Sequence, residues 1–514
     1  MKNPIMVSST QGSGSLSQSE TRAAWALIAG GALLRIASFY FSDNAGGDAG
    51  AHAALAAEWL SHPGLKFVFD NYPPGHFWLI GLVSLAVHNV VLAARLLSLL
   101  SGIASLYFVW RLAHSLYGAS AAFFSLAAFL LYSLHVGYSA TSSAEVPYLF
   151  FLLAGTSFFF SSITGTGKAG QFVLSGVCFS ISESIRYEAW IFFFGLFVVT
   201  ALAWVWRSQF RSRIRLLPLL AWVAAAGAWP AFMMAYCLRT FGDPMHPVTL
   251  NRVAVIKSLA TTTVFHQFAV MPVAILLSVS PLAVLAAVLG LALSFFSDEA
   301  GIFAATTLFF AMVEVYELFS GGLLATARYT ITSGAMLCVL SGLGFEKILQ
   351  KLTPARVNLA RLVVVSLLLL NCAMLLATSA TSGRLADEVA SVSPRLRYQP
   401  HIADVGNYLR THMGANDAVV FDDYNVESNI LAEAAGLPVP PRQRAYLASK
   451  KNEITVLQYV EAEHPRFLVY SDQGTLRQWL DLRPDSIRTQ QIGRTEFRCV
   501  FVGQVYRVYE LNYP

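Results

Sequence analysis

The sequence predicts a polytopic α-helical membrane protein of about eleven spans, with an extracytoplasmic α/β domain at its C-terminus. Hydrophobic residues make up 55% of the 514 positions and charged residues only 13%, whereas about 25% is typical of soluble proteins. Mean hydropathy is +0.55. The charge is unevenly distributed, since 28 of the 65 charged residues lie in the last 120 positions. Residues 23–393 are therefore predicted to form a membrane part, and residues 394–514 a polar domain.

The N-terminal residues 1–22 are rich in serine and are predicted to form a disordered cytoplasmic tail. The apolar run 23–41 is longer than the core of a signal peptide and lacks a small-x-small cleavage site, so we interpret it as the first span. Later apolar runs approach the roughly 20 residues that cross about 30 Å of hydrocarbon. These runs are 91–111, 119–137, 146–162, 170–185, 188–206, 216–238, 265–296, 300–319, 329–346 and 362–380.

One apolar segment, residues 75–88, is too short to cross. It follows Pro73-Pro74 and, as a helix, reaches only about 21 Å, so we predict an interfacial or re-entrant helix. With this segment not counted and the N-terminus inside, the basic loops face the cytoplasm. These loops are 111–114, 168, 207–215 and 347–361. The run 265–296 is counted as one tilted span, because a break at Pro281 would reverse the side of every later loop.

The C-terminal residues 394–514 alternate helical patterns with short β-rich runs, which is typical of a small α/β sandwich. The helical patterns are 402–412, 427–435, 453–463 and 475–482, and the β-rich runs are 418–421, 466–470 and 499–509. The domain contains no GxGxxG, GxSxG or P-loop motif, so we predict no catalytic site there.

Overall charge and cysteine content exclude other classes of protein. A net charge of +5 is too small to indicate nucleic-acid binding. The five cysteines are scattered, without CxxC or Cys/His spacing, and therefore indicate neither a disulfide framework nor a zinc site.

Acidic residues of the predicted external loops are the first candidates for a site, because few acids occur in so apolar a chain. Placing a carboxylate at mid-bilayer costs about 3 kcal/mol, so an acid at the membrane face is informative. Asp48, in the first external loop (42–89), follows Gly46-Gly47, which permits a tight turn, and precedes a helical pattern. It is either an N-cap, worth about 1 kcal/mol, or a functional group. Glu145, in the second external loop (138–147), is either a solvated carboxylate or a second functional acid.

Three arginines also have alternative interpretations. Arg186 either forms an i,i+3 pair with Glu183 or serves a site. Arg35, inside the first span, is either a snorkelling side chain or a site residue. Arg328 either snorkels, binds an anion or pairs with an acid of the preceding span. The acids within reach are Glu314 and Glu317.

Several short motifs occur in order between residues 25 and 346, gathered by the predicted topology on the external side. They are Gly47-Asp48 with His52, Asn71-Tyr72-Pro73-Pro74-Gly75, Ala94-Arg95-Leu96 leading to Leu116-Tyr117-Gly118, the loop 138–147 with Glu145, Arg186-Tyr187-Glu188, Phe241-Gly242-Asp243-Pro244, and Arg328-Tyr329. In this order they resemble the membrane-embedded glycosyltransferases of fold class C, especially the protein O-mannosyltransferase and aminoarabinose transferase superfamily, which use polyprenyl-phosphate sugars.

The resemblance implies that an acid of the first external loop is the catalytic base, and Asp48 is the matching position. Glu145 matches a second acid that frames the site. The resemblance also implies a polyprenyl-phosphate sugar as donor and a glycan, lipid or protein as acceptor. It implies contacts with membrane lipid and a location in the inner (plasma) membrane of a bacterium. Asp48 has no acidic neighbour, so a divalent metal held by Asp48, Glu145 and His52 is left open.

The chemistry of such a donor agrees with this site. A polyprenyl phosphate leaves without a proton from a general acid, so one carboxylate base suffices. The departing charge requires cations at the outer face. We expect these cations to be Arg186, Arg328, Arg252 and Lys66, and we expect His52, Tyr72, Tyr329 and His246 to line the site.

The activity predicted from the sequence is the inverting transfer of a monosaccharide to an acceptor hydroxyl at the outer face of the membrane. Two alternatives belong to other classes of protein. A lipid-linked sugar flippase or transporter would also gather charges between helices, although transporters commonly contain inverted repeats. A catalytically silent scaffold would merely present the C-terminal domain.

Overall fold

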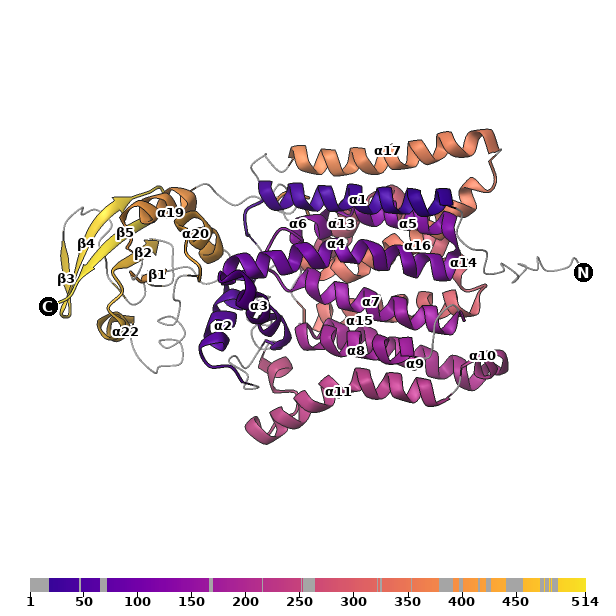
Figure 1. Cartoon of the computed structure of the whole chain (residues 1–514), viewed down its shortest axis with the longest axis horizontal. Coiled ribbons are helices and arrows are strands. Elements are labelled where there is room, and N and C mark those ends of the chain that lie inside the picture. The colour runs from indigo at the N-terminus through magenta and orange to yellow at the C-terminus, as the bar shows by residue number, and fades with distance from the viewer. Residues whose placement is uncertain are drawn as a thin grey trace, which may run out of the picture.

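The computed structural model shows a helical bundle joined to a smaller α/β domain (Figure 1). This confirms the predicted polytopic helical fold with a small C-terminal sheet domain. The structure describes residues 18–45, 48–64, 72–165, 170–214, 216–250, 252, 264–320, 322–323, 326–352, 354–378, 392–396, 401–414, 417–421, 427–440, 456–471, 476, 480, 482 and 489–514. Most of the predicted N-terminal tail lies outside these ranges.

Eight of the described helices are long and apolar enough to cross a membrane. They are α1 (Gln18–Phe41), α4 (Val90–Tyr117), α7 (Glu145–Ile163), α9 (Glu188–Trp206), α11 (Leu216–Phe241), α15 (Asp298–Ser320), α16 (Ile331–Leu349) and α17 (Pro354–Thr378). Most are apolar on every side, as expected for helices whose solvent is lipid. Each one corresponds to an apolar run in the sequence.

Two other predicted spans are shorter helices. The run 119–137 does not form one helix, because α5 (Ala119–Leu130) ends before Tyr132, whose backbone is extended. The chain resumes as α6 (Ser133–Tyr138). The run 170–185 forms α8 (Gly170–Ile185), of 16 residues. The predicted interfacial helix is α3 (Gly75–Val87), and its 13 residues reach about 20 Å, which is less than a crossing.

The run 265–296, predicted as one tilted span, does not form one continuous helix. The segment consists of α13 (Val264–Val279) and α14 (Pro281–Ser294), which meet at an angle of 99°. Pro281 lacks a backbone donor and disfavours helical backbone at the residue before it, and Ser280 has a φ of 83°. The bend therefore has a local cause in the sequence.

Helix α14 ends at the end of the bundle opposite the C-terminal domain (Figure 1). At the end of α14, the Ser294 hydroxyl lies 3.1 Å from the Tyr117 hydroxyl at the end of α4. Shortly after it, Asp298 forms an ion pair with Arg207, next to α10 (Ser208–Arg213). Figure 1 shows α10 at the end of the bundle opposite the C-terminal domain. Helix α15 therefore begins at this end of the bundle, and the sides of the later loops stay a prediction.

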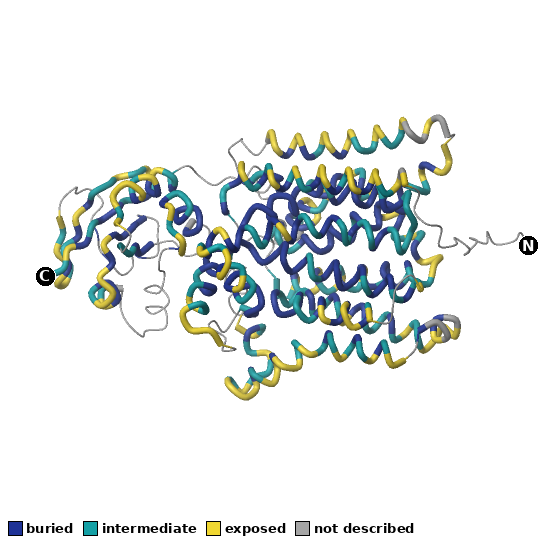
Figure 2. Tube along the Cα trace, in the orientation of Figure 1, coloured by how far each residue is buried: buried dark blue, intermediate teal, exposed yellow. Residues whose placement is uncertain are grey.

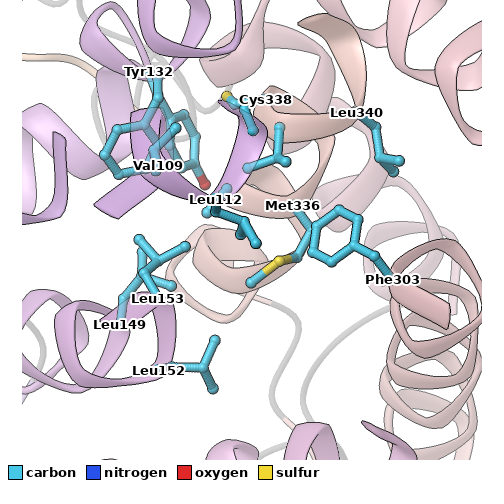
Figure 3. Close-up of a cluster of buried hydrophobic side chains, with 14 of the residues drawn as sticks. Val109, Leu112, Tyr132, Leu149, Leu152, Leu153, Phe303, Met336, Cys338 and Leu340 are labelled. Carbon is cyan, nitrogen blue, oxygen red and sulfur yellow. The ribbon is translucent and has the colours of Figure 1, made fainter. Parts of the chain in front are cut away.

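The core of the bundle is formed by large apolar side chains that point toward one another from α4, α7, α15 and α16 (Figure 3). Both α7 and α16 are buried along most of their length, whereas α11 and α17 run along the outside (Figure 2). Because membrane helices gain little from hydrophobic burial against one another, packing of this kind supplies the stability of the bundle.

The C-terminal domain contains one five-stranded sheet of order β1-β2-β5-β4-β3. The strands are β1 (Val419–Phe421), β2 (Phe467–Ser471), β3 (Gln490–Ile492), β4 (Thr495–Val502) and β5 (Tyr506–Asn512). Strands β1 and β2 are parallel, and the other pairs are antiparallel. The β-rich run 499–509 is therefore two strands rather than one, since Gly503 and its neighbours form a hairpin turn.

Helices cover both faces of this sheet, as an α/β sandwich requires. On one face, α19 (His401–His412) and α20 (Glu427–Ala435) pack against alternate strand residues such as Val469. On the other, α22 (Val456–Glu463) packs against residues such as Leu468. Strand β2 is buried on both faces, which explains its continuous apolar sequence. The helical pattern predicted at 475–482 lies largely outside the described residues.

The α/β domain sits at one end of the bundle, next to α3 and α2 (Ala49–Ser61) (Figure 1). Main-chain hydrogen bonds join the two parts: the Val90 amide donates to the Pro438 carbonyl, and the Asp43 amide to the Leu396 carbonyl. We call this end of the bundle the domain end. All the site residues described below lie there.

Candidate active site

Charged side chains from four distant segments converge at the domain end of the bundle. We call this group the site cluster. Its members are Asp48 before α2, Glu145 at the start of α7, Arg186 and Glu188 between α8 and α9, and Arg328 before α16. Because helix ends meet at this face, residues 280 positions apart in the sequence are in direct contact.

Asp48 is the member of the cluster that the sequence places at a helix start. It occupies the N-cap position of α2, but its side chain makes no capping hydrogen bond. Instead its Oδ2 accepts from Nη1 of Arg328 at 2.9 Å. The side chain of Asp48 is about one-quarter exposed, so the pair is open on one side. The interpretation of Asp48 as a simple N-cap is therefore wrong.

Glu145 is the most deeply buried acid of the cluster, with 2% of its side chain exposed. Its Oε1 accepts from Nη1 of Arg186 at 2.7 Å and lies 3.8 Å from Nη1 of Arg328. The alternative of a solvated loop carboxylate is wrong. Glu145 thus links the two arginines into one network that also includes Asp48.

Arg186 donates through Nε to Oε1 of Glu188 at 3.0 Å and makes a second, shorter contact with the same oxygen through Nη2. The expected pair with Glu183 does not form. Both carboxylate oxygens of Glu183 are buried without a hydrogen-bond partner among the described residues. Glu188 belongs to the site cluster but was not among the predicted site residues. Its position two residues after Arg186, at the start of a span, was the available signal.

The position of Arg186 also depends on close packing of the interfacial helix. A Cβ atom on Gly75, the first residue of α3, would lie 2.0 Å from Oγ of Ser184. Only glycine therefore allows α3 to approach the end of α8 so closely. The Pro73-Pro74-Gly75 motif thereby places α3 directly beside the segment that carries Arg186.

Aromatic rings form a wall beside the arginines. The guanidinium carbons of Arg186 and Arg328 lie 5.3 and 5.1 Å from the ring centroid of Tyr329. Nη2 of Arg328 also donates to the Tyr329 hydroxyl at 3.4 Å. The ring of Tyr148, on α7, lies 5.6 Å from Arg186. Such contacts hold a guanidinium in place without consuming its N–H donors.

His52 lies near Asp48, and His76 packs against His52. The ring of His52 lies 4.7 Å from that of His76 and 5.0 Å from that of Tyr72. Nδ1 of His52 and both nitrogens of His76 are buried without a hydrogen-bond partner among the described residues. Burial lowers the pKa of His52 to about 4, although Asp48 and Glu145 act in the opposite direction. His52 is therefore neutral near pH 7.

The charges of the cluster fix its protonation states. Burial alone would raise the pKa of Asp48, but the nearby charge of Arg328 brings it below its ordinary value. Burial would lower the pKa of Arg186, but Glu188 and Glu145 raise it well above its ordinary range. The site therefore contains an ionised, partly exposed carboxylate beside permanently charged guanidiniums.

Two residues expected at the site make their contacts elsewhere, and a third is not among the residues that the structure describes. Arg252 donates through Nη2 to the Ser320 carbonyl at 3.4 Å. His246 stacks on Phe241 with ring centroids 4.1 Å apart. Lys66 lies outside the described residues. Contacts of the site cluster include neither Arg252 nor His246, so the roles of all three residues stay predictions.

A metal site is the remaining expectation. Within the ranges that the structure describes, no three His, Cys, Asp or Glu side chains are grouped so that they could hold an ion. Asp48 and Glu145 are both directed at arginines instead.

Known proteins share this architecture. Residues 71–233 match the family model described as dolichyl-phosphate-mannose-protein mannosyltransferase. The sequence matches none of the curated proteins. The structure of ArnT from Cupriavidus metallidurans, crystallised with undecaprenyl phosphate, is similar over 95% of this chain and 98% of that chain, with a TM-score of 0.61 and 13% identity. The Archaeoglobus fulgidus oligosaccharyltransferase, tethered to an acceptor peptide, matches 88% of this chain and 69% of that chain, with a TM-score of 0.52 and 10% identity.

At identities this low, the similarity establishes the fold. The chain has the fold of the membrane-embedded glycosyltransferases of fold class C, and the resemblance found in the sequence is confirmed at that level. The segment matched by the family model includes Glu145 and Arg186, whereas Asp48 and Arg328 lie on either side of it. The ion pair between these two residues therefore comes from the structure alone.

Proposed function

We propose that the chain is an inverting glycosyltransferase that moves a monosaccharide from a polyprenyl-phosphate donor to an acceptor hydroxyl at the outer face of the membrane. One observation carries the proposal: the partly exposed Asp48 carboxylate lies 2.9 Å from Arg328, inside a cluster of two arginines and three acids at the mouth of the bundle. The fold supports it, because the proteins of similar architecture include an oligosaccharyltransferase and one crystallised with a polyprenyl phosphate.

In the transfer step, the acceptor oxygen attacks the anomeric carbon of the sugar from the side opposite the phosphate. The new carbon–oxygen bond forms as the bond between the sugar and the phosphate breaks, so the configuration inverts. Asp48 takes the proton of the acceptor hydroxyl. The electron pair of the broken bond stays on the phosphate, which leaves as a polyprenyl phosphate monoester. No general acid is required, because phosphate is a good leaving group.

Arg328 and Arg186 are proposed to hold the donor phosphate, since a guanidinium binds a phosphate through two parallel N–H donors. Arg328 already donates to Asp48, so donor and aspartate compete for the same group. When the phosphate occupies Arg328, the ion pair that lowers the pKa of Asp48 weakens. The carboxylate then becomes a stronger base at the moment when the acceptor must lose its proton.

The net charge of the site cluster matters for the binding of an anionic donor. Three carboxylates and two guanidiniums carry a net charge of −1 when all are ionised. An anionic donor therefore requires further positive charge nearby. Arg252 and Lys66 remain the proposed sources. Glu145 is proposed to orient the arginines and the reactants, and His52, Tyr72 and Tyr329 to line the site.

The proposed setting is the inner membrane of a bacterium, with the N-terminus in the cytoplasm and the α/β domain outside. The excess of basic residues at the end of the bundle opposite the site supports this orientation. The acceptor is proposed to be a glycan, a lipid or a protein that reaches the site from the outer side.

The test is a transfer assay with the purified protein and a panel of radiolabelled polyprenyl-phosphate sugars, with glycan, lipid and peptide acceptors. We expect label to move from at least one donor to one acceptor class, with inversion at the anomeric carbon as observed by NMR. Movement of intact donor across proteoliposomes without transfer would support a flippase and contradict the proposal. Retained configuration in the product would contradict the direct displacement.

A further inference from the structure

A cavity of about 560 Å³ lies between α1, α5 and α17, separate from the site cluster. Its volume falls in the range of ligand pockets, about 300–1,000 Å³. We call it the α1–α17 slot. It is lined almost entirely by apolar side chains. They include Ala26 and Gly30 on α1, Leu130 on α5, and Leu369 and Ala373 on α17.

Helix α1 presents two different faces. A Cβ atom on Gly31 would meet Leu106 at 2.8 Å and Leu130 at 3.1 Å, so this face is closely packed. Arg35 lies fully buried near the same face, where it donates to the Gly31 carbonyl and lies 2.9 Å from Nδ1 of His135. It does not snorkel. On Gly30, by contrast, a Cβ atom would meet nothing within 4 Å, because this residue faces the slot.

The slot is elongated along the direction of the spans. The slot follows the 16 residues of α1 from Ala26 to Phe41, whose ends lie about 22 Å apart. Its polar atoms gather at the domain end, where Oγ of Ser38 donates to the Pro394 carbonyl at 2.6 Å and Nε of Arg395 donates to the Phe41 carbonyl at 2.7 Å. Arg395 thus lies at the domain end of the apolar slot. The slot is longer than half the thickness of a bilayer, whose hydrocarbon core is about 30 Å thick.

Helix α17 has little other contact with the bundle. Only 17% of its spanning window is buried. Apolar side chains that face the slot, such as Leu369, remain half-exposed. In hydrocarbon, a space between two spans has no water to fill it, and its lining loses dispersion contacts unless an apolar chain occupies it.

We propose that the α1–α17 slot binds one anionic phospholipid, with an acyl chain along α1 and the head-group phosphate at Arg395. A phospholipid is complementary to both parts of the slot. The apolar lining matches an acyl chain in length, and the Arg395 guanidinium at the domain end matches an anionic phosphate. The bound lipid would join α17 to the rest of the bundle. None of the slot residues belongs to the site cluster, so this proposal does not depend on the transferase activity.

The experiment is native mass spectrometry of the full-length protein, released from nanodiscs of phosphatidylglycerol or of phosphatidylethanolamine. We expect the wild type to retain one phosphatidylglycerol, and Gly30→Phe, which fills the open space, to lower its occupancy about tenfold, which corresponds to about 1.4 kcal/mol. Ala373→Phe, from the opposite wall, should act in the same way. Arg395→Gln should remove the preference for phosphatidylglycerol. The matched control is Leu285→Phe, on α14, which is 71% exposed and lies outside the slot.

Each variant is first shown to be folded: it elutes as a single species and has the melting temperature of the control. Equal retention by the wild type and by both slot-filling variants would overturn the proposal. So would lipid loss in Leu285→Phe, since the binding would then not be specific to the slot. Co-purified polyprenyl phosphate at the same stoichiometry would overturn the choice of a phospholipid as occupant.

Discussion

The domain end of the bundle contains two arginine–carboxylate clusters that differ in how the arginines are held. In the site cluster, Arg186 and Arg328 donate hydrogen bonds to side chains, those of the three acids and of Tyr329. In the second group, which we call the latch cluster, Arg95 of α4 meets Glu433 of α20 at 3.1 Å. Arg95 also donates to main-chain carbonyls at 2.5 to 2.6 Å. These carbonyls belong to Phe39, Ser42 and Ala140.

The difference separates a structural role from a chemical one. Main-chain carbonyls are fixed by the fold and cannot be replaced by a ligand, so Arg95 is committed to its partners. Asn44 adds to the latch cluster, since it donates to Oε1 of Glu433 at 3.0 Å and accepts from the Ser142 amide at 2.7 Å. The latch cluster thereby holds the segments that lead to Asp48 and Glu145. The partners of Arg328 are side chains that an anionic ligand can displace.

The largest difference between the clusters should appear on removal of the carboxylate charge at the site. Asp48→Asn keeps the size of the side chain and its contact with Arg328 but cannot accept a proton. We expect turnover to fall about 10³-fold, within the range found for general bases. The measurement is the rate of sugar transfer by the purified variant. Glu58→Gln, on an exposed position of the same helix, is the control and should keep wild-type turnover. Wild-type turnover by Asp48→Asn would exclude Asp48 as the base.

The next largest effect should come from the arginine that Asp48 contacts. Arg328→Gln removes a cation from the position where phosphate charge develops, so kcat/KM should fall about 10²- to 10³-fold. Arg328→Lys should recover only part of this loss, because lysine lacks the planar fork. Steady-state kinetics against donor concentration measures both variants. Arg239→Gln, an exposed arginine at the end of α11, serves as control, and an equal loss in it would show that the effect is not local.

The pH dependence of stability should show that the His52 imidazole is buried and neutral. Its pKa is about 4 in the folded protein and about 6.5 when exposed, so the unfolded state binds more protons below pH 6.5 and stability falls as the pH decreases. Between pH 7 and pH 5 the loss is about 2 kcal/mol. His52→Phe should remove this part of the pH dependence in thermal unfolding, whereas the exposed His62→Phe should not. Identical pH profiles for wild type and His52→Phe would contradict the buried neutral imidazole.

The smallest effect is expected in the latch cluster. Burial raises the pKa of Glu433 even though Arg95 lies beside it, so the pair gains little from its charge. Glu433→Gln can still accept from Arg95 and Asn44, and it should lower stability by only about 1 kcal/mol. Turnover should stay within about twofold of the wild type. Thermal unfolding and transfer rates of the same preparation measure both quantities. A loss of turnover as large as that of Asp48→Asn would remove the distinction between the clusters.

Much of the fold follows directly from the sequence, because hydrocarbon imposes a simple length rule on apolar runs. Helices α7 and α9 begin and end within one residue of the predicted runs 146–162 and 188–206. The exceptions occur where local backbone chemistry interrupts an apolar run. Pro281 divides α13 from α14, and Tyr132 separates α5 from α6, although hydropathy alone shows no break at either position.

Four of the five members of the site cluster were predictable from the sequence, but their pairings were not. Asp48, Glu145, Arg186 and Arg328 stand out because ionised side chains are rare in an apolar chain. Sequence spacing favoured Glu183 as the partner of Arg186, whereas the structure joins Arg186 to Glu188 and to Glu145, which is 41 positions away. Such pairings depend on which helix ends meet, and no local pattern encodes that.

The most direct test of the account is the affinity of Asp48→Asn for polyprenyl phosphate, measured by calorimetry in detergent alongside the wild type. If donor phosphate and Asp48 compete for Arg328, removal of the carboxylate charge should tighten binding about tenfold, or about 1.4 kcal/mol, while transfer is lost. Weaker binding by Asp48→Asn than by the wild type would contradict the exchange of partners at Arg328. The central claim about this site would then fail.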